Sequence, residues 1–315
     1  FNDYSRRAGR QISASGDVIG NFSAQEMFRS RQIADVLNPY GVLRECCDSD
    51  EHPETVPVIL ALDVTGSMGS AAVEVAKRLN TVMTKLYDNT KDVEFMIMGI
   101  GDLAYDRAPI QASQFESDIR IAEQLDKLYF EGGGGGNGYE SYTAAWYFAL
   151  NNTRLDCHNR GKKGLIITMG DEPLNPYLPK APLEASLGVS NEKDIETKDL
   201  YSEVIEKFDI YHLAVIDPRS NGARYEDKIM SSFGEFFNIE NSKRRIGNGL
   251  AENELCVVLK CGVEFLLCAV GGDKSSGDTH FCHCYRDEVE SSAVNADSFH
   301  LHRSCTCLSR KTRKE

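Results

Sequence analysis

An acid and two hydroxyl groups recur at alternate positions in residues 60–71, which read LALDVTGSMGSA. Asp63, Thr65 and Ser67 follow a run of apolar residues and precede a stretch with helical spacing. Side chains at alternate positions of a strand that turns into a loop can point toward one centre. Oxygen ligands of this kind suit a hard divalent cation such as Mg²⁺, with Mn²⁺ or Ca²⁺ as alternatives. The spacing therefore predicts a metal site.

Other chemistries fit this segment less well. A serine hydrolase needs the pattern G-x-S-x-G, but Thr65 stands two residues before Ser67. An aspartyl phosphotransferase would want a second acid two residues after Asp63, where Thr65 stands again. A phosphate-binding loop needs a lysine, which neither this segment nor the glycine-rich residues 132–138 supply. A helix N-cap remains the structural alternative, although a cap does not need the acid at the end of the strand.

The rest of the chain alternates between segments with strand and helix patterns. We expect strands at 56–63, 93–102, 109–115, 163–173 and 208–217, and a last strand at 236–241. We expect helices at 24–41, 72–86, 117–129, 140–152, 193–207 and 225–235. Alternating strands and helices predict an α/β fold, a three-layer α/β/α sandwich around a mainly parallel sheet. The third strand follows a short loop and is the candidate antiparallel edge strand.

The pattern divides the chain into three parts. Residues 1–55 are polar and form an extension that ends in an acidic linker, residues 56–240 form the main domain, and residues 241–315 form a Cys/His-rich tail. Seven of the ten cysteines lie in this tail. The scarcity of cysteine in the main domain suggests a reduced, cytoplasmic protein.

The tail carries a second set of candidate metal ligands. Cys282, Cys284, Cys305 and Cys307 could bind Zn²⁺, with neighbouring histidines nearby. Their C-x-C spacing differs from the C-x₂₋₄-C spacing of common zinc modules. Disulfide bonds, or a poorly ordered appendage without a specific site, are the alternatives.

Charge and hydropathy limit the choice of partners. The formal net charge is −13, which argues against a general affinity for nucleic acid or for an anionic membrane surface. No apolar run reaches the roughly 18 residues of a membrane span. A protein partner is therefore the expectation.

The segment DVTGSMG, placed after an apolar strand, resembles the metal-ion-dependent adhesion site of von Willebrand factor type A (VWA) domains, whose usual form is D-x-S-x-S. Further segments, FRSRQIADVLNPYGV, EGGGGGNGYESYTAAWYFA and GDEP among them, resemble a group of bacterial and phage-encoded VWA proteins. The resemblance covers roughly 56–240. It implies the Rossmann-like VWA fold, an antiparallel third strand, and metal-dependent contact with a carboxylate of a protein partner.

The resemblance also implies which residues would hold the metal. Asp63, Thr65 and Ser67 match the first motif, with threonine in place of the commoner serine. Asp171 is the candidate for the family's third segment, an aspartate that closes the fourth strand, although it comes about two residues later than expected.

The second segment departs from the family pattern. VWA domains usually have a threonine after paired glycines, whereas this chain reads GGGGGNGYES. Asn137, Glu140 or Ser141 would have to serve in its place. Asp102, at the end of the second strand, is expected at the same sheet edge and could contribute through water.

We expect these residues to support binding rather than turnover. A metal held largely by hydroxyl groups keeps a position that a partner's carboxylate can fill, and no general base stands nearby in the sequence. The expected function is a divalent-metal-dependent protein-binding module, an adaptor or assembly factor, and not an enzyme. The alternative is a metal-assisted hydrolase that uses the same acids.

Overall fold

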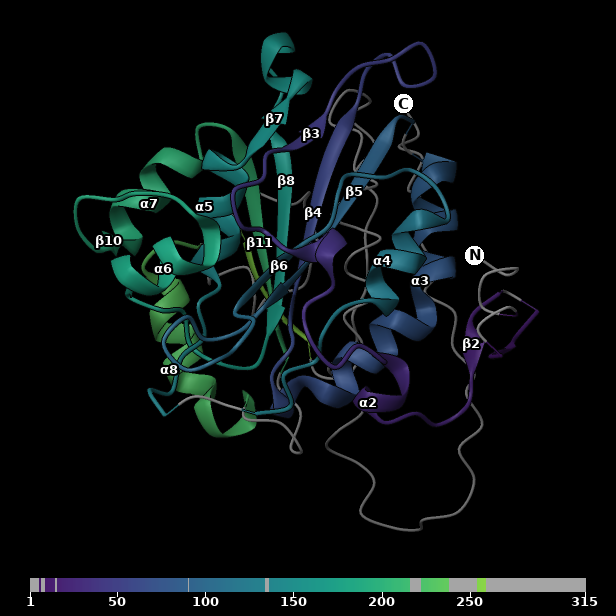
Figure 1. The fold of residues 1–315 in the computed structure, drawn as a ribbon, viewed down its shortest axis with the longest axis horizontal. Helices are drawn as coiled ribbons and strands as arrows, with labels where there is room; N and C mark the ends of the chain where they lie inside the picture. The colour runs from purple at the N-terminus through teal and green to yellow at the C-terminus, as the bar shows by residue number, and fades with distance from the viewer. Residues whose placement is uncertain are drawn as a thin grey trace, which may run out of the picture.

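The computed structural model describes residues 6, 9–14, 16–89, 91–133, 136–215, 222–237 and 254–258. Its centre is a six-stranded sheet with the strand order β12-β11-β8-β4-β5-β6 (Figure 1). The strands are β4 (Val56–Asp63), β5 (Val93–Ile100), β6 (Ile110–Ala112), β8 (Gly164–Gly170), β11 (Phe208–Val215) and β12 (Glu254–Val258). Every neighbouring pair is parallel except β5 with β6, which is antiparallel. The predicted mainly parallel sheet with one antiparallel edge strand is confirmed.

Both faces of the sheet are covered, which explains the near-continuous apolar strands. In β4, Leu60 and Leu62 belong to the core on one face, whereas Ile59 and Ala61 belong to the core on the other. Helices α3 (Gly69–Asn89) and α4 (Arg120–Asp126) lie on the first face. Helices α5 (Thr143–Asn151), α6 (Lys180–Leu187), α7 (Thr197–Val204) and α8 (Gly222–Gly234) lie on the second (Figure 1). The chain is a three-layer α/β/α sandwich, as the sequence predicts.

The N-terminal extension packs on the first face, but the helix predicted over 24–41 is wrong. The structure has one turn of helix, α2 (Ala24–Met27), and a 3-10 turn, η1 (Asp35–Leu37). Ser23 and Glu26 form a capping box at the start of α2, and Phe28 ends it in an extended conformation. Met27 and Leu37 are each fully buried. The apolar residues of this segment therefore contact the core separately. Their spacing in the sequence does not distinguish such contacts from one face of a helix.

Three short pairings lie outside the predicted pattern. β1 (Gln11–Ile12) pairs with β2 (Val18–Ile19), β3 (Arg44–Cys46) with β7 (Thr153–Leu155), and β9 (Tyr177–Leu178) with β10 (Ile195–Glu196). The 3-10 turns η2 (Gly66–Met68) and η3 (Asp156–Arg160) complete the described elements. Strands of two or three residues carry too little periodicity for the sequence to reveal them.

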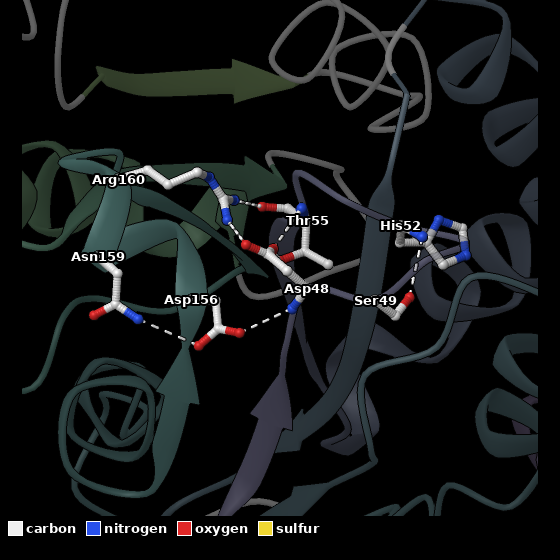
Figure 2. Close-up of polar contacts among 7 residues, drawn as sticks. All are labelled: Asp48, Ser49, His52, Thr55, Asp156, Asn159 and Arg160. Carbon is white, nitrogen blue, oxygen red and sulfur yellow. Dashed lines mark hydrogen bonds and ion pairs between the residues drawn. The ribbon is translucent and has the colours of Figure 1, made fainter.

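Figure 2 shows that the acidic linker before β4 is held at the amino edge of the sheet. Asp48 Oδ1 accepts hydrogen bonds from the Thr55 hydroxyl (2.7 Å) and backbone N–H (3.0 Å). Arg160 forms an ion pair with Asp48 and donates to the carbonyl of Thr55 (2.7 Å). Asp156 Oδ2 accepts from the backbone N–H of Asp48 (2.9 Å). The linker is thus held in a defined conformation, and we call the network of Asp48, Thr55, Asp156 and Arg160 the amino-edge corner.

The sheet extends beyond the predicted boundary at residue 240. Residues 254–258 fall in the predicted tail, yet they form β12 and pair with β11 from Tyr211 to Val215. The strand predicted at 236–241 is not found where it is described, because Phe236 and Phe237 close a turn after α8. Cys282, Cys284, Cys305 and Cys307, the candidate zinc ligands, lie outside the described residues. None of the helices in the described ranges has the length and apolar character to cross a membrane.

Candidate functional site

Three acids meet where the parallel strands end. Asp63 is the last residue of β4, Asp171 follows β8 directly, and Asp102 comes two residues after β5. Because β8, β4 and β5 are neighbours in the sheet, their carboxyl ends lie side by side. Asp63 and Asp171 are completely buried, and Asp102 is nearly so. The topology therefore places the predicted metal residues at one edge.

Hydrogen bonds join the first and third motif segments. Asp63 Oδ1 accepts from the Thr65 hydroxyl (2.6 Å) and from the Thr65 backbone N–H (2.9 Å). The Ser67 hydroxyl donates to Asp171 Oδ1 (2.9 Å), across 104 residues of sequence. Asp171 also contributes to raising the pKa of Asp63, so the two carboxyl groups are near each other. The structure brings Asp63, Thr65, Ser67 and Asp171 together as predicted.

Tyr142 is a member of the site that the sequence did not reveal. Its buried hydroxyl donates to Asp63 Oδ2 (2.9 Å) and accepts from the backbone N–H of Glu172 (3.3 Å). A Cβ atom at Gly170 would lie 1.8 Å from this hydroxyl oxygen, so the tyrosine needs glycine there. Tyr142 therefore links the end of β4 to the loop after β8. In the sequence, Tyr142 is only a tyrosine at the start of a helix. Such a residue is equally well explained as an aromatic side chain of the core.

The glycine-rich loop lies against the first motif. The backbone N–H of Gly66 donates to the carbonyl of Gly133 (2.8 Å), and that of Glu131 donates to the carbonyl of Val64 (3.0 Å). A Cβ atom at Gly66 would lie 3.0 Å from the carbonyl oxygen of Gly132. This close approach of two backbones accounts for glycine at Gly66 and fixes the loop beside the motif.

The three residues proposed for the second segment have different places. Ser141 is buried, and its hydroxyl accepts from the backbone N–H of Leu103 (3.0 Å). Burial raises the pKa of Asp102, and hydrogen bonds from the backbone N–H of Ala104 and from Asn137 partly offset this rise. Glu140 is 2% exposed, and Asp63 is the charge that most raises its pKa. Of the three, Glu140 is the one whose pKa depends on the charge of Asp63.

Burial and neighbouring charges raise the pKa values of the acids at this edge. Burial, and then the charge of Asp171, raise the pKa of Asp63 to about 7. Burial, and then the charge of Asp63, raise the pKa of Glu140 to about 11. In the described part of the chain no Lys, Arg or His forms an ion pair with Asp63, Asp102 or Glu140. Asp102 Oδ2 and Glu140 Oε2 are buried without a hydrogen-bond partner.

These features fit a cation with hard oxygen ligands. A divalent ion would neutralise part of the negative charge of these carboxylates, which raise each other's pKa values. Among the described residues, no three His, Cys, Asp or Glu side chains are grouped so that they could hold a metal ion by themselves. A cation here would therefore depend on the hydroxyl groups of Thr65 and Ser67 together with Asp63 and Asp171.

Comparisons with known proteins concern the fold. No protein-family model and no curated protein matches the sequence. Solved structures that match include the SpaC pilus adhesin from Lactobacillus rhamnosus GG (12% identity, TM-score 0.38, 73% of this chain and 31% of that chain). BatB from Bacteroides thetaiotaomicron matches at 12% identity and TM-score 0.39, over 67% of this chain and 95% of that chain. The SpRpn10 VWA domain matches at 11% identity and TM-score 0.38, over 70% and 98%. The α/β/α architecture itself stands on the strand order and on the two buried faces of the sheet.

Proposed function

We propose that this chain is a divalent-cation-dependent protein-binding module. The observation that carries the proposal is the joined pair of contacts at the carboxyl edge, Thr65 with Asp63 and Ser67 with Asp171. These contacts involve two completely buried carboxyl groups, Asp63 and Asp171. The sequence resemblance to the metal-ion-dependent adhesion site points to the same residues.

Some of these residues would bind the cation, and others would fix the orientation of its ligands. Ser67 is half-buried and the most accessible of the motif oxygens, so it is a ligand on the solvent side. Asp63 is held on both oxygens, by Thr65 and by Tyr142, which fixes its orientation. When bound, the cation would supply an open coordination position that accepts a carboxylate from the partner.

Binding rather than turnover is favoured by the environment of the nearest histidine. His212 stacks on Phe233 with ring centroids 3.9 Å apart and lies 4.9 Å from the ring of Tyr142. Burial lowers its pKa to about 3, so it stays neutral and enclosed in the core behind the site. It cannot reach a substrate as a general base.

A metal-assisted hydrolase is the second candidate, and one side chain favours it. Burial raises the pKa of Asp106 to about 6, which suits a general base near neutral pH. However, Asp106 Oδ2 accepts a hydrogen bond from the backbone N–H of Asp102 (2.7 Å). This oxygen therefore already stabilises a turn of the loop. We therefore favour a binding function over hydrolysis. The proposed role as an adaptor or assembly factor in the cytoplasm of a bacterial or phage-infected cell rests on the sequence resemblance.

The proposal is tested with the Ser67→Ala variant. Isothermal titration of Mg²⁺ into the full chain should give binding heat for the natural sequence and a strongly weakened signal for Ser67→Ala. Ser70→Ala is the matched control, because Ser70 is exposed and lies three residues along the same segment. A pull-down with Mg²⁺ and with EDTA then asks whether partner capture follows metal binding. Equal heats for Ser67→Ala and the natural sequence would refute the site.

A further inference from the structure

Three of the loops that carry an acid at the carboxyl edge also carry a tyrosine. The pairs in chain order are Asp102 with Tyr105, Glu140 with Tyr139, and Asp171 with Tyr177. Tyr105 is 60% exposed and Tyr177 is 37% exposed, so both belong to the exposed large hydrophobic side chains of the described residues. Tyr139 is half-buried between the acids and the solvent. We call Tyr105, Tyr139 and Tyr177 the tyrosine rim.

The three rim residues lie on one surface. The loops of Tyr139 and Tyr177 lie side by side, because the backbone N–H of Glu140 donates to the carbonyl of Pro173 (3.3 Å). Burial, followed by the charges of Tyr177, Asp102 and Tyr105, raises the pKa of the Tyr139 hydroxyl. A Cβ atom at Gly136 would lie 4.0 Å from the hydroxyl of Tyr105, so this ring reaches the glycine-rich loop. The backbone N–H of Tyr105 donates to the carbonyl of Asp102 (3.2 Å), which fixes its turn next to the acid.

The same loops are strongly negative. Residues 101–109, 131–142 and 171–179 contain six carboxyl groups and one arginine, namely Asp102, Asp106, Glu131, Glu140, Asp171, Glu172 and Arg107. Even with Glu140 protonated, five carboxyl groups outnumber the single arginine, and a divalent cation offsets only two negative charges. A partner that brought only a carboxylate would therefore approach a surface of its own sign, which weakens encounter and binding. Charge complementarity requires a basic group beside the partner's acid.

Exposed tyrosine rings are suited to one basic group in particular. Arginine stacks its planar guanidinium on aromatic faces, whereas lysine is a more strongly hydrated point charge. Tyrosine loses little conformational freedom on binding and is enriched among the residues that dominate interface energies. The rim and the acids together thus present ring faces next to negative charge.

We infer that the tyrosine rim recognises an arginine of a protein partner, adjacent to the acidic side chain that the cation would take. This inference rests on the proposed function for the acidic side chain, but the arginine contact itself needs only the rim and its neighbouring acids.

An array of short synthetic peptides tests this inference with the full chain. Every peptide carries one aspartate or glutamate and varied neighbours, and binding is read with Mg²⁺ and with EDTA. We expect selection of the acid in Mg²⁺ and enrichment of arginine beside it. A Tyr105→Ala/Tyr177→Ala variant should bind the arginine-bearing peptides roughly fivefold to tenfold more weakly, as expected for exposed cation–π contacts. It should keep its requirement for Mg²⁺ and for the acid.

Two further variants separate the rim from general damage. Tyr105→Phe/Tyr177→Phe keeps both rings and should retain the arginine preference. Tyr40→Ala removes a tyrosine that is also 60% exposed but lies in the N-terminal extension, and it should bind like the natural sequence.

The outcomes distinguish the two proposals. Selection of the acid without a basic neighbour, or an arginine preference that survives in the double alanine variant, would overturn the rim and leave the proposed function standing. Arginine selection without any acid or Mg²⁺ requirement would support the rim and overturn the cation-dependent function. No selection at all would overturn both.

Discussion

The two ends of the same sheet treat their acids in opposite ways. At the amino edge, Asp48 is hydrogen-bonded by Thr55 and paired with Arg160, and these contacts lower the pKa of its carboxyl group (Figure 2). At the carboxyl edge, Asp63 and Glu140 are buried beside other acids, and their pKa values are raised. An acid that has its own cationic partner is a structural anchor. We propose that a buried acid without one takes an external cation.

The largest expected effect is a loss of metal binding at the carboxyl edge alone. Asp171→Asn removes one carboxylate that accepts from Ser67. Mg²⁺ affinity should fall by more than roughly 100-fold, because loss of groups behind the ligands alone reaches 10–100-fold in metal sites. Calorimetry gives the affinity. Asp156→Asn at the amino edge is the matched control and should bind Mg²⁺ normally; a similar loss there would erase the contrast between the edges.

Tyr142→Phe sharpens the comparison by removing one hydroxyl group while keeping the ring. Asp63 Oδ2 and the N–H of Glu172 both lose their partner. Mg²⁺ affinity should fall roughly 10- to 100-fold, as for other groups that orient a ligand. Tyr147→Phe on the same helix removes a hydroxyl that donates to Asn191 (3.1 Å) and should leave the affinity unchanged. Equal affinities in all three proteins would show that Tyr142 has no positioning role.

The pH dependence of stability should also separate the two edges. Glu140 has a folded pKa of about 11, well above its usual value, so the metal-free folded state holds a proton that the unfolded state releases. Stability should therefore fall as pH rises from about 6.5 to 8, by at most about 1.4 kcal/mol per pH unit. Urea unfolding in EDTA measures this slope. Glu140→Gln should flatten it, and an unchanged slope in this variant would contradict the assignment.

The smallest effect is expected at the amino edge. Arg160→Gln removes the ion pair with Asp48 and the hydrogen bond to Thr55. Because these side chains are partly exposed, the free energy of unfolding should fall by only about 1 kcal/mol. Mg²⁺ affinity should not change. Thermal unfolding and calorimetry on this variant measure the two quantities. A change in Mg²⁺ affinity would show that the amino edge is coupled to the carboxyl edge and is not purely structural.

The sequence predicted the parts of the fold that depend on local pattern. The buried strands β4, β5, β8 and β11 read as apolar runs because both of their faces are covered, and the predicted sheet follows from them. The helix over 24–41 failed, since its apolar residues contact the core separately rather than along one helix face. β12 lies in the segment predicted to be a tail, and only its pairing with β11 assigns it to the sheet.

The site shows the same division. The D-x-T-x-S spacing of Asp63, Thr65 and Ser67 is local, so the sequence alone identified it. The contribution of Tyr142 depends on how α5 packs against β8 and on the space left at Gly170, which no local pattern encodes. Glu140 was one of three candidates for the second segment, and only the packed structure shows that its pKa depends on the charge of Asp63.

The central claim is that the carboxyl edge takes up one divalent cation, and Mn²⁺ tests it most directly. Electron paramagnetic resonance measures free Mn²⁺ in a titration of the full chain, for the natural sequence and for Asp63→Asn. We predict that the natural sequence removes one equivalent of the free signal, that Mg²⁺ competes for it, and that Asp63→Asn does neither. Equal uptake by both proteins, or no uptake by the natural sequence, would contradict the claim.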